Sequence, residues 1–487
     1  MLFNSIEFLI FFPVVTIVYF LLKHQHRWWW LLAASCVFYM AFRPEYLLIL
    51  GFTIVVDYYA GMLIENAVGK SRKWYLIMSL VANIGVLAFF KYTNFFIIAL
   101  GQADIAHFNI LDFVLPIGLS FHTFQAMSYT IEVYRVKQKA EKHFGLYALY
   151  VMFYPQLVAG PIERPQNVLP QFYEKKTFDY QRVTSGLKLI AWGLFKKVVI
   201  ADRLALFVDK VYDNPLQYEG VPIIVATIFF SFQIYCDFSG YSDIALGTAE
   251  VMGFKLMKNF DRPYFSKSIS EFWRRWHISL STWFRDYLYI PLGGNRVNVY
   301  RRYFNLFFVF TISGLWHGAN WNYIIWGALH GIYLIGAVLT QKPREYFNKI
   351  TQIPKVPLLF KVFQASITFA LVTFAWIFFR ASYLEMSWCW HLVTHLFSNF
   401  PAPSQLLKFN YISENIFLGF TLYEFCLAIG LIIFMEIIHY IQRDKSIREL
   451  ISTKPLVARW SIYYIFIMLF FILGVFDKPA QFIYFQF

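Results

Sequence analysis

The chain has little charge and little cysteine for its length. Only 15% of its 487 residues are Asp, Glu, Lys or Arg, whereas a soluble protein carries roughly 25%. The four cysteines lie scattered in apolar stretches, without the spacing of metal ligands, and we expect them to be inert packing residues (Cys36, Cys236, Cys389 and Cys426). These absences argue against a soluble enzyme and against a disulfide or zinc scaffold.

Several motifs of common enzyme classes are also missing. The chain has no nucleotide-binding P-loop and no G-x-S-x-G nucleophile elbow, so we expect no serine acyl-enzyme of the hydrolase kind. We see no internal repeat and no long linker, and we predict one membrane domain over residues 1–487. The acidic Glu7 precedes the first apolar run and Lys23 follows it, the reverse of a cleavable signal peptide. We therefore expect a retained first span with its N-terminus outside.

Apolar residues dominate from end to end. The chain is 59% hydrophobic and its mean hydropathy is +0.50. Charge-poor runs recur at residues 8–22, 28–42, 74–90, 221–236, 303–315, 323–339, 362–379, 416–435 and 461–475. Several are shorter than the roughly 20 residues of an upright span, so some must tilt or re-enter. The sequence predicts an all-α polytopic membrane protein with about 11 spans, plus re-entrant or interfacial helices.

The chain is basic, with 43 Lys and Arg against 29 Asp and Glu and a formal net charge of +14. In a soluble protein such an excess would indicate nucleic acid. In a membrane protein, basic loops lie on the cytoplasmic side and face anionic lipid. We therefore expect a lipid bilayer and no nucleic acid as partner. Segments 102–112 and 209–220 are poorer in basic residues and are expected outside.

His317 is the most informative single residue. It is an ionisable imidazole inside an apolar run, preceded by Trp316 and followed closely by Asn320. A titratable group in a membrane segment is costly and is a functional-site candidate. Imidazole exchanges a proton near neutral pH, so it could deprotonate an acceptor hydroxyl or a thiol carrier during acyl transfer. The alternative is a core histidine that bonds a neighbouring carbonyl.

A second histidine, His277, lies in the segment 262–294. Apolar residues at spacings of three and four predict one face of a helix, which is too charged to span and should lie at the cytoplasmic interface: Trp273, Trp276, Leu280, Trp283 and Tyr287. Arg274, Arg275 and Arg285 lie elsewhere around this helix. His277 falls at the edge of the apolar face, and its alternative is a residue that snorkels among lipid headgroups.

Other polar residues in apolar runs have structural explanations. His330 lies within a G-x-x-x-G spacing, which favours helix packing. His391 and His395 are four residues apart, but no third metal ligand is evident, and we expect no metal. Asp237 and Asp243 follow a span; they would cap a helix that begins near Ser242, orient a histidine or gate a polar cavity.

Four motifs together resemble the membrane-bound O-acyltransferase (MBOAT) family. The specific ones are residues 271–288, which contain His277, and residues 314–320, which contain His317; residues 159–162 and 237–243 also match. The resemblance is closest to the branch of bacterial alginate and peptidoglycan O-acetyltransferase membrane subunits. The first residues, 1–5, and the last, 482–487, look typical of that branch.

The resemblance implies a ring of tilted helices around a transmembrane tunnel, in the bacterial cytoplasmic (inner) membrane. It implies that His317 is essential and that His277 is its companion, with a supporting role for Asp237, Asp243 and His330. It implies an acetyl donor, expected to be acetyl-CoA, and no permanently bound cofactor. The residues expected to line the donor site and the tunnel are Trp273, Arg274, Arg275, Trp276, Arg285, Trp316 and Asn320. The acetyl group would pass to an extracytoplasmic partner of the SGNH-hydrolase type that esterifies a polysaccharide.

Two alternatives stay open at this point. The same fold could transfer D-alanine to teichoic acid from a cytoplasmic phosphopantetheine carrier protein as acyl donor. A proton-coupled transporter could use Asp237, Asp243 and the histidines as a relay, although paired broken helices in two halves, typical of transporters, are not evident.

Overall fold

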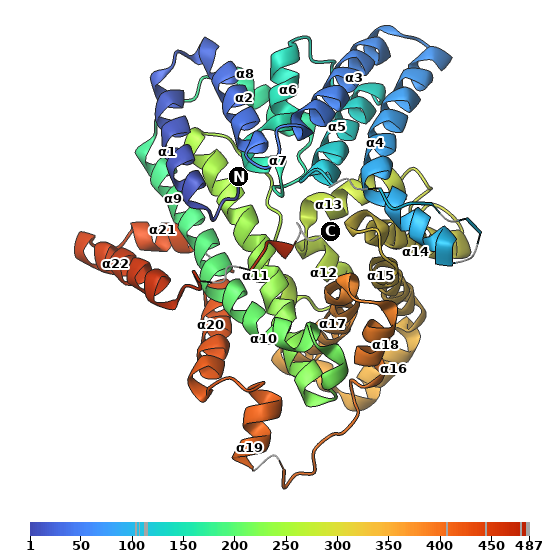
Figure 1. Cartoon of the computed structure of the whole chain (residues 1–487), viewed down its shortest axis with the longest axis vertical. Helices are drawn as coiled ribbons and strands as arrows, with labels where there is room; N and C mark the ends of the chain where they lie inside the picture. Colours follow the sequence, from blue (N-terminus) through green and yellow to red (C-terminus); the bar gives the residue numbers. More distant parts are fainter. Residues whose placement is uncertain are drawn as a thin grey trace. The chain divides into compact units, whose positions relative to one another are not determined.

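The computed structural model describes residues 1–102, 105–106, 108–111, 115–405, 408–443, 446–477 and 480–483. Every regular element in these ranges is a helix, as the sequence predicts (Figure 1). The chain divides into two compact units: unit 1 is Met1–Leu194 with Tyr241–Lys258, and unit 2 is Phe195–Gly240 with Asn259–Phe487. A single membrane domain over residues 1–487 stays a prediction.

Unit 1 contains the first nine α-helices and the end of α11 (Val221–Met252). The nine helices are α1 (Ile6–Leu21), α2 (His24–Met40), α3 (Tyr46–Asn66), α4 (Lys70–Gln102), α5 (Leu119–Tyr134), α6 (Phe144–Met152), α7 (Tyr154–Leu157), α8 (Pro165–Tyr173) and α9 (Tyr180–Leu194). The helices α3, α4 and α5 pack side by side (Figure 1).

A buried polar cluster joins these three helices of unit 1. Asp57 on α3 accepts hydrogen bonds from Ser79 Oγ at 2.6 Å and from Asn83 Nδ2 at 2.8 Å, both on α4. Ser79 Oγ also lies 3.0 Å from Thr130 Oγ1 on α5. In a lipid environment such interhelical hydrogen bonds fix which helices pair, because the unbonded groups would be left in an apolar medium.

Unit 2 contains the first part of α11 and the remaining helices. These are η1 (Phe195–Ala201), α10 (Asp202–Tyr212), η2 (Pro215–Gln217), η3 (Pro263–Phe265), α12 (Ile269–Arg275), α13 (Ile278–Phe284), η4 (Arg285–Tyr289), α14 (Val299–His317), α15 (Trp321–Leu339), α16 (Gln341–Thr351), η5 (Ile353–Lys355), α17 (Pro357–Arg380), η6 (Ala381–Tyr383), α18 (Met386–Thr394), α19 (Phe409–Tyr411), η7 (Ile412–Ile416), α20 (Leu422–Ile441), α21 (Ile447–Ser452) and α22 (Leu456–Leu473).

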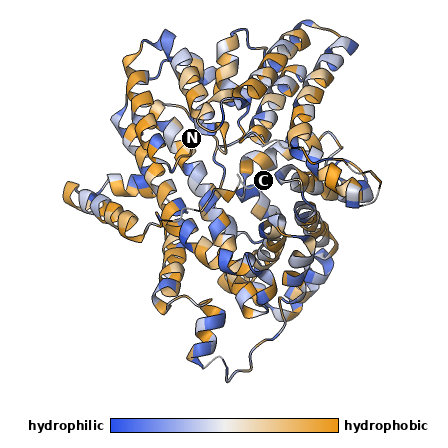
Figure 2. Ribbon diagram, viewed as in Figure 1, coloured by the Kyte–Doolittle hydropathy of each residue, from blue (hydrophilic) through white to orange (hydrophobic). Residues whose placement is uncertain are grey.

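Seven of the described helices are long and apolar enough to cross a membrane: α3, α4, α11, α15, α17 with η6, α20 and α22. The helix α22 buries none of its apolar window, and hydrophobic residues predominate along α20 and α22 (Figure 2). So much uncovered apolar surface requires lipid. The chain is therefore a multi-pass membrane protein. The apolar run 303–315 lies in α14, which is not among the seven and carries Arg301 and Arg302 in its first turn.

The segment 262–294 is not the single helix that its apolar spacing predicts. The helix α12 ends at Arg275 and α13 begins at Ile278, and His277 between them has φ +42°. The Ile278 N–H donates to the Asn259 carbonyl at 2.9 Å, and the Asp261 N–H donates to the Arg275 carbonyl at 2.8 Å. The segment 259–261 therefore takes over backbone hydrogen bonds at the break. The periodicity of apolar residues could not predict this break, because the backbone groups that replace the helical hydrogen bonds come from a separate segment.

Two stretches bear on where helices end. The stretch 154–165 contains three prolines, which lack the backbone donor of a helix, and it interrupts the helical path: α7 ends at Leu157 and α8 begins only at Pro165. The predicted helix start near Ser242 is wrong. The helix α11 continues from Val221 to Met252, so neither Asp237 nor Asp243 caps a helix there.

Glycines allow α14 and α15 to approach very closely. A Cβ on Gly314 would lie 2.2 Å from the Tyr323 carbonyl oxygen, and a Cβ on Gly327 would lie 2.3 Å from the Phe310 carbonyl oxygen. A Cβ on Gly318 would meet the Tyr323 ring at 2.1 Å. A larger residue at Gly314 or Gly327 would require the backbone to move, and one at Gly318 would require the Tyr323 ring to move. The close crossing fixes the position of the end of α14, where His317 lies.

Candidate active site

His317 is the last residue of α14 and is buried among aromatic rings of three helices. Its ring centroid lies 5.0 Å from that of Trp316, 5.0 Å from that of Trp326 on α15 and 5.3 Å from that of Phe379 on α17. All three contacts are edge-to-face. The imidazole therefore packs against the rings of Trp316, Trp326 and Phe379, which restrict its rotation.

His277 is completely buried and its ring is oriented by Asn259. Its Nδ1 lies 3.1 Å from Asn259 Oδ1. The same oxygen accepts a hydrogen bond from the Ser279 backbone N–H at 3.3 Å, which identifies it as the carbonyl end of the amide. Nδ1 must therefore be the protonated nitrogen of His277. Its Nε2 then carries the lone pair.

The surroundings of His277 keep its imidazole neutral. Burial lowers the pKa of His277 from 6.5 to about 3, because a charged ring would be poorly solvated there. The Phe238 ring lies edge-on at a centroid distance of 4.7 Å, and the Trp316 ring lies at 6.3 Å. Since Trp316 also contacts His317, its indole connects the two histidines. His277 is thus suited to accept a hydrogen bond at Nε2 and poorly suited to hold a proton.

His330 on α15 positions Trp273 of α12. The indole Nε1–H of Trp273 donates to Nδ1 of His330 at 3.2 Å, and the two rings lie 4.9 Å apart. Trp326, one turn earlier on α15, contacts both His330 at 5.1 Å and His317 at 5.0 Å. His330 therefore packs as predicted and also supports an indole of the candidate donor site.

A cavity of about 650 Å³ lies among α12, α13, α14 and α15. Three arginines line it: Arg274, Arg285 and Arg302. The rest of its wall is largely apolar, with Trp273, Leu306, Val309, Phe310 and Leu334 among the lining residues. Ser313, one helical turn before His317, and Ile278, which follows His277, also line it. The cavity thus joins a cationic region to the immediate neighbourhood of both histidines, although neither ring itself is part of its lining.

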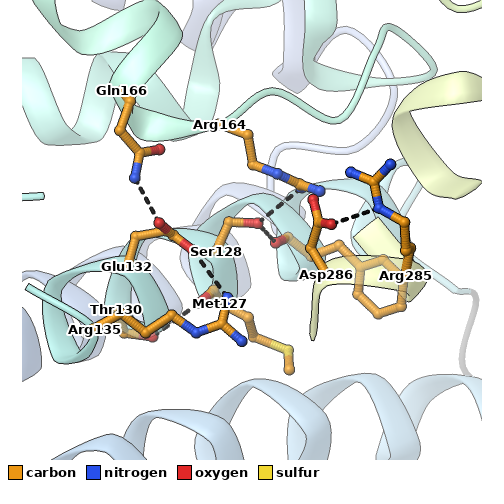
Figure 3. Close-up of polar contacts among 10 residues, drawn as sticks. Met127, Ser128, Thr130, Glu132, Arg135, Arg164, Gln166, Arg285 and Asp286 are labelled. Atoms are coloured by element: carbon orange, nitrogen blue, oxygen red, sulfur yellow. Dashed lines mark hydrogen bonds and ion pairs between the residues drawn. The ribbon is translucent and has the colours of Figure 1, made fainter. Parts of the chain in front are cut away.

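Arg285 and Arg275 each have an acidic partner. Arg275 pairs with Glu271 at 2.6 Å within α12, and this pair is partly exposed. Arg285 pairs with the adjacent Asp286 at 2.8 Å (Figure 3). The Arg285 side chain is exposed. Figure 3 also shows a pair in unit 1, where the Glu132 carboxylate accepts from Arg135 and Gln166.

Two other predicted residues of the donor site, Trp276 and Asn320, make packing and capping contacts. Trp276 is buried, with the rings of Phe260, Phe272 and Trp376 at centroid distances of 5.1, 5.5 and 5.0 Å. Asn320 caps α15, because its Oδ1 accepts from the Asn322 N–H at 2.8 Å. These contacts fix the walls around the two histidines.

Asp237 belongs to a buried ionic network of unit 2. The Lys197 ammonium lies 2.7 Å from Asp237 and 2.8 Å from Asp202, and it donates to the Ala480 carbonyl at 2.8 Å. Asp237 also accepts from the Ile483 N–H at 2.8 Å. This network ties the segment 480–483 to α11. Asp243 lies in the part of α11 that belongs to unit 1.

Among the described residues, no group of three or more His, Cys, Asp or Glu side chains is arranged to hold a metal ion. His391 and His395 stack on each other with centroids 4.0 Å apart. Their nitrogens face backbone oxygens, with His395 Nδ1 at 3.1 Å from the His391 carbonyl. A stacked pair of this kind is a packing arrangement at the C-terminal end of α18.

Sequence reasoning missed three residues around the site. Asn259 gives no periodic signal, since it lies in an irregular segment far from His277 in sequence. Arg302 is one of the basic residues that we expected only to lie on the cytoplasmic side and face anionic lipid, although it lines the cavity. Lys197 did have a signal, because two consecutive lysines interrupt an otherwise apolar stretch, and such a charge needs an acidic partner.

Comparison with known proteins gives matches over most of the chain. The sequence model of the MBOAT, membrane-bound O-acyltransferase family, matches residues 46–344. The chain is 40% identical over 399 residues to "Probable alginate O-acetylase AlgI" of Pseudomonas aeruginosa, covering 80% of this chain and 74% of that protein. It is 38% identical over 419 residues to "Peptidoglycan O-acetyltransferase" of Helicobacter pylori, covering 79% of this chain and 78% of that protein.

A more distant match covers less of the chain. "Teichoic acid D-alanyltransferase" of Streptococcus thermophilus is 31% identical over 262 residues, which is 50% of this chain and 60% of that protein.

Proposed function

The chain belongs to the membrane-bound O-acyltransferase family, and on that premise we propose that it is a membrane O-acetyltransferase subunit. It takes acetyl from a cytoplasmic donor, acetyl-CoA, and passes it through the bilayer for O-acetylation of an extracytoplasmic polysaccharide such as alginate or peptidoglycan. The observation that carries this proposal is the arginine-lined cavity whose wall reaches Ser313 and Ile278, the neighbours of His317 and His277.

The chemistry of the cavity fits a coenzyme A thioester. The donor carries several phosphate charges, which guanidinium groups bind well, and Arg274, Arg285 and Arg302 supply three. Its pantetheine arm and acetyl group are less polar and suit the wall formed by Trp273 and Phe310. A volume of about 650 Å³ lies within the roughly 300–1,000 Å³ of small-molecule sites.

In this proposal His317 is the proton acceptor. An acceptor hydroxyl attacks the thioester carbonyl carbon while His317 takes its proton; the C–S bond breaks, and the proton passes to the leaving thiolate. The products are an ester and free coenzyme A. A base works best when its pKa lies near the ambient pH, and burial lowers the pKa of His277 to about 3. His277 therefore orients a hydroxyl or thiol through a hydrogen bond to Nε2.

The proposed membrane arrangement follows the distribution of basic residues. Arg274, Arg285 and Arg302 lie at the end of unit 2 where α14 begins and α15 ends. The positive-inside rule assigns this end to the cytoplasm. The helices then form the tilted ring around a tunnel that is expected of the family, about 11 passes in the cytoplasmic membrane of a bacterium. His317, at the far end of α14, lies toward the extracytoplasmic side.

The proposal includes an extracytoplasmic partner of the SGNH-hydrolase type, which completes the transfer to the polysaccharide. Coenzyme A is large and polyanionic and cannot cross lipid, whereas an acetyl group can cross when it is transferred from one nucleophile to another. A cytoplasmic protein that presents the acyl donor is the alternative to free acetyl-CoA. D-alanyl transfer to teichoic acid is the runner-up, and the shorter, weaker match to such an enzyme ranks it lower.

The decisive test combines cells and vesicles. Deleting the gene should remove base-labile acetate from one envelope polysaccharide; loss of base-labile D-alanine instead would favour the runner-up. Purified protein in vesicles with acetyl-labelled acetyl-CoA outside should release coenzyme A and form a labelled ester. Label that crosses still attached to its carrier would identify a transporter and overturn the proposal.

A further inference from the structure

One buried hydroxyl in the wall of the arginine-lined cavity has no partner. It belongs to Ser313 on α14, a residue that lines the cavity and is only 4% exposed. Among the residues that the structure describes, none is hydrogen-bonded to this hydroxyl. Since the large majority of buried polar groups in proteins are paired, an unpaired hydroxyl in a cavity wall indicates a ligand that completes its hydrogen bond.

Two comparable hydroxyls nearby are bonded to backbone carbonyls. Thr311, on the same helix as Ser313, donates to the Phe307 carbonyl at 2.8 Å, which is a common bond for a serine or threonine inside a helix. Ser281, in the wall of the same cavity, donates to the Trp276 carbonyl at 3.2 Å. Within the described chain Ser313 makes no such bond, so its O–H is available to a molecule in the cavity.

Ser313 marks the inner end of the cavity along α14. The described α14 residues in the cavity wall are Arg302, Leu306, Val309, Phe310 and Ser313, and only the first and the last of these are polar. At about 1.5 Å per residue, the two polar residues lie about 16 Å apart along the helix. A phosphopantetheine arm has about 13 bonds between phosphorus and sulfur, and such a chain spans roughly 15 Å at the rise of an extended polypeptide. A phosphate held at Arg302 therefore brings the thioester to Ser313.

Ser313 and His317 lie on the same face of α14. His317 is the last residue of this helix, and residues four apart on a helix are neighbours, with roughly 5–6 Å between their Cβ atoms. The close crossing with α15, where a Cβ on Gly314 would lie 2.2 Å from the Tyr323 carbonyl oxygen, fixes this part of α14. A thioester carbonyl between the two side chains can present its carbon toward His317 and its oxygen toward Ser313.

Resting on the proposed function, we infer that Ser313 is a further catalytic residue, whose hydroxyl donates a hydrogen bond to the carbonyl oxygen of the thioester. When the acceptor hydroxyl attacks the carbonyl carbon, the electron pair of the C=O bond moves onto that oxygen, and the O–H of Ser313 stabilises the negative charge. The pair returns as the C–S bond breaks, and the proton that His317 took from the acceptor goes to the leaving thiolate. Ser313 keeps its own proton throughout, so no acyl-enzyme forms on it.

The test compares the full wild-type chain with Ser313→Ala in lipid nanodiscs. For release of coenzyme A from acetyl-CoA, kcat should be about 10²- to 10³-fold lower in the variant, the effect of removing one donor to an oxyanion. Two unreactive probes measure binding. The dethia analogue of acetyl-CoA, with CH₂ in place of the thioester sulfur, keeps the carbonyl oxygen, and its Kd should rise by about three- to tenfold in the variant. S-ethyl-coenzyme A has no carbonyl oxygen, and its Kd should stay the same.

Thr311→Val is the matched control, because it removes a hydroxyl of the same helix that does not line the cavity; it should match the wild type in all three measurements. A wild-type kcat in Ser313→Ala would overturn the inference. So would an equal loss of affinity for both probes, since that identifies a packing role for Ser313. The wild-type protein tests the proposed function separately: absence of both turnover and probe binding overturns that function, whereas turnover that Ser313→Ala leaves unchanged overturns only the inference.

Discussion

Asn259 Oδ1 accepts the Nδ1–H of His277 at 3.1 Å, and this single contact decides which nitrogen of the imidazole carries the lone pair. The contact forms because residues 259–261 hydrogen-bond across the break between α12 and α13. His277 contacts Asn259 while its backbone is in the left-handed conformation, at φ +42°. Such a conformation costs of order 1–3 kcal/mol and persists where surrounding contacts enforce it.

Replacing Asn259 should therefore impair turnover through His277. Asn259→Leu removes the acceptor, frees the ring to exchange tautomers and should lower kcat by about 10- to 100-fold with little change in KM for acetyl-CoA. Asn259→Asp keeps an acceptor and adds a charge that stabilises imidazolium, so it should retain activity with a shifted pH profile. Thr311→Val, which removes a hydroxyl that bonds the Phe307 carbonyl within α14 and does not line the cavity, is the control and should keep the wild-type profile. Equal profiles for all three variants would exclude the positioning role.

His317→Ala should abolish O-acetylation of the cell envelope without affecting membrane insertion. A general base contributes roughly 10²- to 10⁴-fold, so His317→Gln, which keeps much of the volume but not the basicity, should be similarly inactive. The measurement is base-labile acetate in purified envelope polysaccharide, normalised to the amount of protein in the membrane. His395→Ala, at the stacked histidine that directly follows α18, should retain full acetylation. Retained acetylation in both His317 variants would remove His317 from the mechanism.

The arginine-lined cavity predicts a charge-dependent KM. Arg302→Ala and Arg285→Ala each remove one guanidinium from the cavity and should raise KM for acetyl-CoA by about tenfold, with a smaller change in kcat. Added salt should raise KM in the wild-type protein and have less effect in the variants. Arg301→Ala alters the neighbouring arginine, which does not line the cavity, and should match the wild type. An equal rise in KM for Arg301→Ala would indicate a general surface potential instead of a site.

Two glycines of α15 should respond oppositely to the same change. Gly327→Ala places a methyl group 2.3 Å from the Phe310 carbonyl oxygen and 3.0 Å from Gly314 Cα, so it should destabilise the protein by at least about 1–3 kcal/mol. A Cβ on Gly336 would have nothing within 4 Å, and Gly336→Ala should be neutral or stabilise by up to ~1 kcal/mol. Thermal unfolding in detergent measures both. Similar melting temperatures for the two variants would contradict the close crossing of α14 and α15.

Glu163 in unit 1 predicts a stability change with pH. Burial raises the pKa of Glu163 from 4.5 to about 7, although its carboxylate accepts from Asn167 at 2.6 Å and from the Met257 N–H at 2.5 Å. Between pH 4.5 and 7 the folded protein therefore holds a proton that the unfolded chain has lost. The contribution of Glu163 to the free energy of unfolding is fully present below pH 4.5 and is lost as pH rises through 7. Glu163→Gln mimics the neutral acid and should flatten the fall in melting temperature between pH 5 and 8. Glu45→Gln, at an exposed site, should not.

Much of the architecture follows from local sequence properties. Apolar runs with little charge predict membrane helices, because a buried backbone in lipid must satisfy its own hydrogen bonds. The three prolines in 154–165 predict the interruption between α7 and α8 for an equally local reason, since proline lacks the backbone donor. His317 was identifiable because an ionisable group in an apolar run is costly wherever the run folds.

The positions of the polar groups relative to one another required the tertiary structure. The helix break at His277 depends on the bond between His277 and Asn259, and the Lys197–Asp237 pair joins two other helices. The residues of each pair are not related by the repeat of a helix, so no sequence pattern predicts that they meet. The helix α11 continues through Asp237 and Asp243, although these residues locally suggested a helix start. Here too the local sequence did not predict the structure, because Asp237 is bound by groups elsewhere in the fold.

The sequence by itself thus determined a helical membrane protein with two histidine motifs, because hydropathy and the cost of burying charge act residue by residue. Only the tertiary structure decided which histidine nitrogen is the acceptor and which arginines share a cavity. Those properties depend on the distances between side chains from separate helices, and such distances are set by packing.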